Sequence, residues 1–282
     1  MSATSLDDSM TACLDSVRRL DHDRFLTALM APPEKRAALI ALYAFNVEIA
    51  RVREAVSEPM LGQIRLQWWR ETVEGIARGE VRGHEAAIAL AETWTREAFP
   101  AARLTALIDA RERDLDDAPF EDMEALEAYG EGTSSSLMAL AGFALAGDET
   151  QTAAIRPAGI AYALTGLLRA LPVHASQGRL YLPLDLMRSH DVDPHRIFAG
   201  EMSEGLRAVM NEIAGQARIR LAEARVAKPS GMLLPMLLPA SLCDRYLDLM
   251  TAPDFDPFHN STEVPAFRRQ LRLMGRKLAG RF

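Results

Sequence analysis

The chain has 282 residues, 49% hydrophobic and 25% charged, and its 32 basic against 39 acidic residues give a formal net charge of −7. This composition is typical of a globular protein and excludes long disorder, collagen-like repeats and disulfide scaffolds. The acid surplus argues against general nucleic-acid binding, which needs excess Lys and Arg. We therefore expect no nucleic-acid partner.

The N-terminal segment and the cysteines indicate the compartment. Five aspartates fall within the first two dozen residues, which fits neither the apolar stretch of a signal peptide nor an acid-poor mitochondrial presequence. Cys13 and Cys243 lie outside any CxxC spacing, so neither a zinc site nor a disulfide framework is predicted. The most apolar run, 232–242, is too short to span a membrane. We expect a cytoplasmic protein.

Apolar residues recur with helical spacing almost throughout, and no stretch predicts a strand ladder, so the predicted fold class is all-α. A first apolar stripe runs from Leu42 through Ile49 to Val56, and a second helix runs from about Leu61 to Ile76. Further helices are predicted at 85–97, 100–115, 121–146, 151–171, 203–227, 231–250 and 263–279. Prolines are expected to punctuate the later connections: Pro172, Pro183, Pro194, Pro229, Pro253 and Pro257. No repeat or linker is visible, which favours a single domain.

Common catalytic motifs are absent from the sequence: there is no GxSxG, HExxH or P-loop, and no GxGxxG after a strand. The run 189–195 has residue types of a metal site but fits a surface loop better. The acidic run 109–117 could supply carboxylates to a cation, although mixed signs are more typical of a salt-bridged face.

The last predicted helix is amphipathic and basic. Four apolar residues share one face, Phe267, Leu271, Met274 and Leu278, and arginines and lysine surround them. We expect this stripe to join the core, as in an ordinary terminal bundle helix. Peripheral contact with the inner face of the cytoplasmic membrane, or docking on a partner, stays open as an alternative.

Six strings occur in the order seen in squalene/phytoene synthases: Leu42–Phe45, Gln67–Glu71, Asp114–Leu115, Tyr129 with Ser134–Ser136, Leu164–Arg169 and Gly178–Pro183. The chain resembles that family from about Asp21 to the C-terminus. The resemblance implies an N-terminal extension at 1–20 and, at 21–282, an all-α domain of the isoprenoid synthase type, a helical bundle around a central cavity.

In that family, two DxxxD pairs hold Mg²⁺ against prenyl diphosphates. Positions i and i+4 lie about 6 Å apart along a helix axis, so two carboxylates there can share hard cations. In this sequence the first pair falls at Ala50 and Glu54, with Arg51 beside Ala50, and the second at Ala170 and His174. Three of the four expected carboxylates are missing, so we expect no catalytic residues, no metal and no cofactor.

The departures match one branch of the family. The chain resembles the branch that includes a mitochondrial respiratory complex I assembly factor. The residues that carry this resemblance are the segments 44–50 and 56–59, then Gly62, Arg65 and Trp69, the run 109–117, Tyr129 with Ser134–Leu137, and Arg169–Pro172. That factor is regarded as a non-catalytic relative promoting biogenesis of a core matrix-arm subunit at the inner membrane. The resemblance implies a complex I subunit or assembly intermediate as partner.

The first hypothesis is therefore a pseudoenzyme that acts in complex I assembly and binds a partner protein or a prenyl or lipid-like ligand. In one interpretation, Arg51, Arg53, Arg169 and Arg179 bind the phosphate of such a ligand directly. In the other, they form ion pairs with nearby carboxylates and bind no ligand. Both interpretations stay open. The candidate ligand pocket comprises Tyr43, Asn46, Glu48, Arg51, Arg53, Asp109, Arg113, Asp114, Tyr129, Thr165, Arg169, Arg179 and Tyr181.

The second hypothesis is an active prenyl-diphosphate transferase in squalene, carotenoid or hopanoid synthesis. It would need Mg²⁺, with Glu54, Asp109, Asp114 and Glu131 as ligands and Tyr129 or Tyr181 near the reacting carbons. A third is a lipid-binding module recruited by the basic helix.

Overall fold

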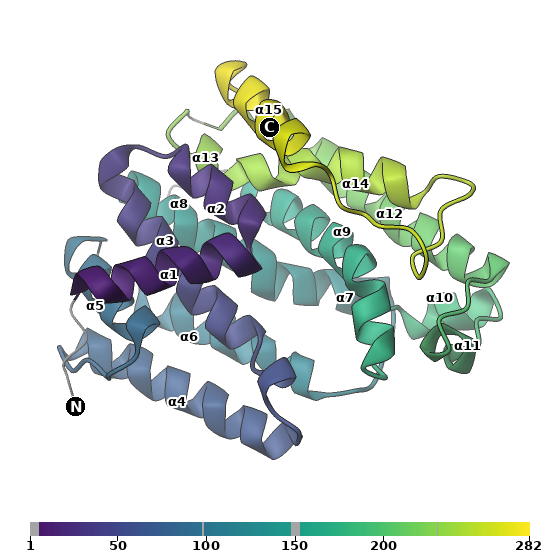
Figure 1. Cartoon of the computed structure of the whole chain (residues 1–282), viewed down its shortest axis with the longest axis horizontal. Helices are drawn as coiled ribbons and strands as arrows, with labels where there is room; N and C mark the ends of the chain where they lie inside the picture. Colours follow the sequence, from purple (N-terminus) through teal and green to yellow (C-terminus); the bar gives the residue numbers. More distant parts are fainter. Residues whose placement is uncertain (1–5, 98, 148–152, 230) are drawn as a thin grey trace. The chain divides into compact units, whose positions relative to one another are not determined.

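The computed structural model describes residues 6–97, 99–147, 153–229 and 231–282 (Figure 1). Within these ranges the regular elements are helices, and the only ladder contact is an isolated bridge between Phe120 and Pro183. The prediction of an all-α fold is confirmed. By its internal contacts the chain divides into two compact units. The first lies within Met1–Asp116, Ser136–Gln151 and Ser230–Met236, and the second within Asp117–Ser135, Thr152–Pro229 and Leu237–Phe282.

The first unit is built around one long buried helix, α3. Its helices are α1 (Leu6–Leu20), α2 (His22–Leu29), α3 (Pro33–Ala50), α4 (Pro59–Ala77), α5 (Glu85–Glu97), α6 (Ala101–Ala110) and α8 (Ser136–Ala146). Pro33 opens α3, at a position whose N–H would have no helical partner. Apolar residues then surround the helix on every side, so α3 packs against α1, α2, α5 and α8 at once.

The second unit is organised by α9. Its helices are α7 (Met123–Gly130), α9 (Ile155–Ser176), α10 (Leu184–Ser189), α11 (Pro194–Phe198), α12 (Glu204–Val226), α14 (Cys243–Met250) and α15 (Ala266–Leu278). Helix α9 packs on α7, α12, α14 and a π-helical turn, Glu131–Ser135. A Cβ at Gly159 would lie 2.4 Å from Ser135 Cα, so this close approach of α9 to the turn requires glycine.

Several predicted boundaries are wrong. The stripe from Leu42 to Val56 does not lie on one helix, because α3 ends at Ala50, a 3₁₀ turn follows at Arg53–Ala55, and Val56 is extended. The next helix, α4, begins at Pro59. The predicted helix 121–146 is broken by the π-helical turn, and 231–250 becomes α13 (Leu234–Leu237), a 3₁₀ turn at Leu238–Leu242 and α14.

Pro172 does not punctuate a connection as predicted, because it lies inside α9. Proline removes the N–H that would bond the carbonyl four residues earlier, which weakens an isolated helix. Here α9 continues to Ser176 because α7, α12 and α14 pack along it. Tertiary packing thus outweighs the local penalty.

Candidate functional site

The first degenerate motif lies where α3 ends. Ala50 is the last residue of α3 and Glu54 belongs to the following 3₁₀ turn, so the two are not stacked on one helix face. Arg51 Nε donates to Glu54 Oε2 at 3.0 Å, and both side chains are about half exposed. Arg53 donates to the Val56 carbonyl at 3.5 Å. The one remaining acidic side chain of this motif therefore has a guanidinium beside it.

Three further predicted residues lie along α3. Tyr43 is buried, and burial raises the pKa of its hydroxyl above the ordinary value. Asn46 is also buried, and its Oδ1 accepts from Arg111 at 3.5 Å. Glu48 lies 3.7 Å from His84 Nε2. These residues belong to the first unit, and each has a polar or charged neighbour within it, which for Tyr43 is the Arg24 guanidinium 5.9 Å from the ring centre.

The acidic run 109–117 is a network of ion pairs. Arg70 of α4 donates to Asp109 at 2.7 Å and to Glu112 at 2.6 Å. These two bonds join α4 to the end of α6. Farther along the run, two further pairs link residues three apart, Arg111 to Asp114 at 3.3 Å and Arg113 to Asp116 at 3.5 Å. This is the arrangement of a salt-bridged face.

The second motif position lies within an aromatic cluster. The His174 ring on α9 contacts the Tyr181 ring, with 4.4 Å between the centroids and a tilt of 38° between the ring planes. Tyr129 lies 6.0 Å from Tyr181, and Phe120 lies 5.3 Å from Tyr129 and 6.0 Å from Tyr181. The structure thus brings three predicted residues together and adds Phe120, which no sequence motif indicated.

The end of α9 explains how Tyr181 reaches His174. Gly178 adopts a positive φ of 70°, and the Arg179 N–H donates to the His174 carbonyl at 2.9 Å. This glycine-dependent helix ending reverses the chain. The returning segment then runs beside Phe120, where the Leu184 N–H donates to the Phe120 carbonyl at 2.7 Å. The string Gly178–Pro183 therefore has a structural role in closing the cluster.

The remaining predicted residues are also in the second unit. Thr165 is buried and donates to the Ala161 carbonyl at 2.7 Å, within α9. The Arg169 guanidinium lies 3.8 Å from the centre of the Tyr246 ring on α14, a cation–π contact. Arg179 is buried, and Ala170 lies on α9 one residue after Arg169. Among the described residues, no group of three or more His, Cys, Asp or Glu side chains is placed to hold a metal ion.

Comparison with known proteins decides the family. The model of the squalene/phytoene synthase family matches residues 17–275. The chain belongs to the squalene/phytoene synthase family. Family membership agrees with solved structures: a dehydrosqualene synthase superposes with a TM-score of 0.83 at 17% identity, covering 96% of this chain and 95% of that one. A squalene synthase from Alicyclobacillus acidocaldarius gives 0.68 at 17% identity, covering 98% and 97%. The predicted isoprenoid synthase fold is confirmed.

Relatives of this family member fall into two groups. It is 33% identical over 255 residues to the human NADH dehydrogenase (ubiquinone) complex I, assembly factor 6, covering 89% of this chain and 76% of the relative. The Bos taurus protein of that name matches with the same identity and coverage. The phytoene synthase of Thermus thermophilus is 29% identical over 286 residues, covering 99% and 96%. The predicted resemblance to the assembly-factor branch is confirmed.

Proposed function

We propose that this protein is a non-catalytic member of the squalene/phytoene synthase family that acts in the assembly of respiratory complex I. The observation that carries the proposal is the residue set at the two motif positions, where Ala50, Ala170 and His174 replace carboxylates. The 33% identity to complex I assembly factor 6 over most of the chain supports the same function.

The physical argument concerns magnesium. Mg²⁺ prefers hard oxygen ligands in near-octahedral geometry, which alanine does not offer and imidazole replaces poorly. The remaining carboxylate, Glu54, forms an ion pair with the Arg51 guanidinium at 3.0 Å. At the second motif, the His174 ring is packed against the Tyr181 ring. Diphosphate departure without a bound metal would lack its main electrostatic support.

The alternative is an active prenyl-diphosphate transferase with an altered metal site. The identity to phytoene synthase over 99% of the chain favours it. Its proposed ligands weigh against it, because Asp109 pairs with Arg70 at 2.7 Å, Asp114 with Arg111 at 3.3 Å, and Glu131 with Arg156 at 2.8 Å. A metal would have to displace these guanidinium groups.

A turnover assay separates the two functions. Purified protein is incubated with farnesyl or geranylgeranyl diphosphate, Mg²⁺ and NADPH, beside an active phytoene synthase as positive control. The expected result is no thirty- or forty-carbon hydrocarbon. Steady product formation that disappears in Glu54→Gln would establish the transferase and overturn the proposal.

A deletion strain tests the assembly role directly. We expect loss of NADH:quinone oxidoreductase activity with unchanged squalene, carotenoid and hopanoid content. Complementation with Glu54→Gln should restore the activity as fully as the wild-type chain does, because no metal chemistry is involved. Loss of isoprenoid with normal complex I would contradict the proposal.

A further inference from the structure

The C-terminal helix α15 exposes its apolar stripe. Phe267, Leu271, Met274 and Leu278 are between 52% and 86% exposed, whereas Leu273 is fully buried. The prediction that this stripe joins the core is therefore wrong. The helix packs through a different face, and four large apolar side chains on one line remain accessible to solvent.

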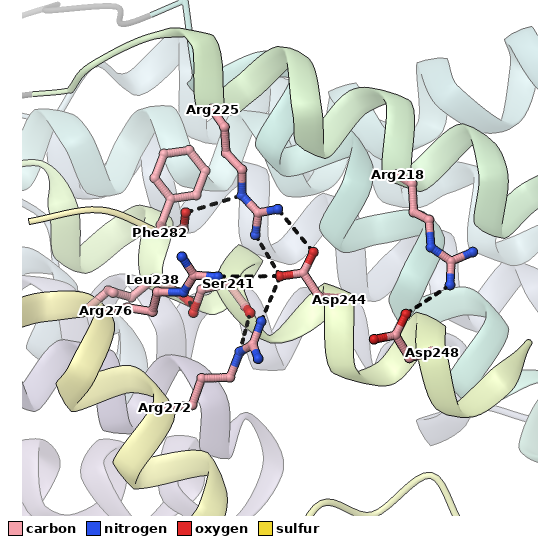
Figure 2. Close-up of polar contacts among 9 residues, drawn as sticks. All are labelled: Arg218, Arg225, Leu238, Ser241, Asp244, Asp248, Arg272, Arg276 and Phe282. Atoms are coloured by element: carbon pink, nitrogen blue, oxygen red, sulfur yellow. Dashed lines mark hydrogen bonds and ion pairs between the residues drawn. The ribbon is translucent and has the colours of Figure 1, made fainter. Parts of the chain in front are cut away.

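Polar anchoring explains which face is buried. Arg272 of α15 donates to the Ser241 carbonyl at 2.8 Å and to Asp244 at 2.7 Å, and Arg276 lies 3.8 Å from the same carboxylate (Figure 2). Arg225 of α12 binds Asp244 through two bonds, of 3.0 and 2.7 Å. Three guanidinium groups thus share one carboxylate, which holds α15 in place and leaves an excess of positive charge.

A basic cavity lies beside this anchor. It has a volume of about 220 Å³ between α14 and α15, and the described residues that line it include four arginines and no acidic residue. The lining residues are Leu242, Arg245, Tyr246, Val264, Arg268, Arg269 and Arg272. Guanidinium groups bind phosphate oxygens in bidentate fashion, so this cavity is suited to a phosphate group.

We propose that α15 docks on an anionic phospholipid bilayer, with its apolar stripe in the headgroup boundary and a lipid phosphate in the arginine-lined cavity. The positive charge of this surface favours an anionic bilayer as the binding partner. Helix α15 contains five basic residues and no acid, in a chain whose net charge is −7. Exposed basic side chains at 268, 277 and 281 flank the stripe.

The arrangement suits a membrane surface. Interfacial helices lie parallel to the bilayer with their apolar residues about 5–10 Å into the headgroup boundary and their Lys and Arg residues at the lipid phosphates. In α15 the stripe runs along the whole helix with basic residues on its flanks, as that geometry requires. The inference depends on the surroundings of α15 within the second unit and stands apart from the proposed role in complex I assembly.

Vesicle flotation with the full chain tests the proposal. The protein is mixed with vesicles of phosphatidylcholine alone, or of phosphatidylcholine with phosphatidylglycerol, at low and high salt. We expect flotation with the anionic vesicles only, and about a tenfold loss of affinity at high salt, where screening shortens the reach of surface charges. Failure to bind anionic vesicles at low salt would overturn the proposal. A protein partner would then be the better candidate for this face.

Matched variants distinguish binding through α15 from attraction by the overall charge of the protein. The double variant Phe267→Ser and Leu278→Ser, and the single variant Arg268→Glu, should each lose about tenfold in affinity. The controls lie elsewhere in the second unit: Val226→Ser, at another exposed apolar residue, and Arg188→Glu, at another exposed arginine, should bind as the wild type does. An equal loss in Arg188→Glu would show attraction by overall charge alone and contradict the proposal.

The cavity is tested through α14. Arg245 lines it but does not belong to α15, so Arg245→Gln leaves the helix unchanged. We expect a several-fold loss of affinity for phosphatidylglycerol vesicles. Unchanged binding by this variant would contradict the proposal that the cavity binds a lipid phosphate.

Discussion

The Arg51 guanidinium lies 3.0 Å from the Glu54 carboxylate at the first motif, and the pair is about half exposed to solvent. A contrasting pair occurs in the second unit, where the buried Glu127 accepts two bonds from Arg220, of 2.8 and 2.6 Å, and one from Gln216 at 2.7 Å. The two glutamates differ in solvent exposure and in number of partners, and their substitutions should differ accordingly.

We expect Glu127→Gln to lower the free energy of unfolding by about 2–3 kcal/mol, because hydrogen bonds to a buried charged group are lost or weakened. Glu54→Gln should change it by less than about 1 kcal/mol, since exposed ion pairs contribute little. Urea unfolding of both variants measures the difference. Equal losses would show that burial does not distinguish these two carboxylates.

Alanine substitutions at two glycines of α9 should have opposite effects on stability, because only one of these glycines lies against the π-helical turn. A Cβ at Gly159 would meet Ser135 backbone atoms at 2.4 and 2.5 Å, so Gly159→Ala should destabilise the protein by about 2–4 kcal/mol. At Gly166 such a Cβ would meet, among the described residues, no atom within 4 Å beyond its chain neighbours and the helix's own backbone, and Gly166→Ala should stabilise the protein by about 0.5–1 kcal/mol. Thermal unfolding checks both, and a loss at Gly166 would be contrary to this account.

The anchor of α15 should weaken in acid. Partial burial raises the pKa of Asp244, but its bonds with Arg225 and the charges of Arg225, Arg272 and Arg276 outweigh that effect, and the pKa is lowered. A lowered folded pKa stabilises the protein above the unfolded value of about 3.9 and loses that stabilisation as the pH falls through the folded value.

Asp244→Asn should therefore cost about 2 kcal/mol at neutral pH, and the gap between variant and wild type should shrink below about pH 4. Urea unfolding at several pH values measures this gap. The control is Asp248→Asn on the same helix, whose exposed carboxylate makes a bond of 3.2 Å with Arg218 (Figure 2). A gap at Asp244 that persists unchanged in acid would contradict the assigned ion pairs.

Cys13 is expected to be unreactive in the folded protein. Burial in α1 raises the pKa of its thiol to about 12, with Glu85 and Glu48 adding to the shift, so the thiolate is scarce at pH 8. Cys243 is buried as well. Iodoacetamide should label neither cysteine until urea unfolds the chain. A Ser189→Cys variant, exposed at the end of α10, should react at once and serves as the positive control.

The sequence predicts those parts of the structure that depend on interactions between residues close together in the chain. Periodicity placed α4, α5 and α12 close to their observed bounds because amphipathic spacing is a local property. It failed at α9, where Pro172 is tolerated within the helix, and after Ala50, where α3 ends although the apolar spacing continues to Val56. At α9 the helices that pack along it, rather than the proline itself, determine the backbone.

The family and the missing carboxylates are properties of residue identity, so the strings Leu164–Arg169 and Gly178–Pro183 and the residues Ala50 and Ala170 could be interpreted without coordinates. The orientation of α15 could not. Its apolar stripe and its arginine face both offer contacts to a neighbour, and the choice depends on Asp244 and on a carbonyl 31 residues before Arg272. Only the tertiary structure brings those partners within bonding distance, and it turns the stripe to solvent.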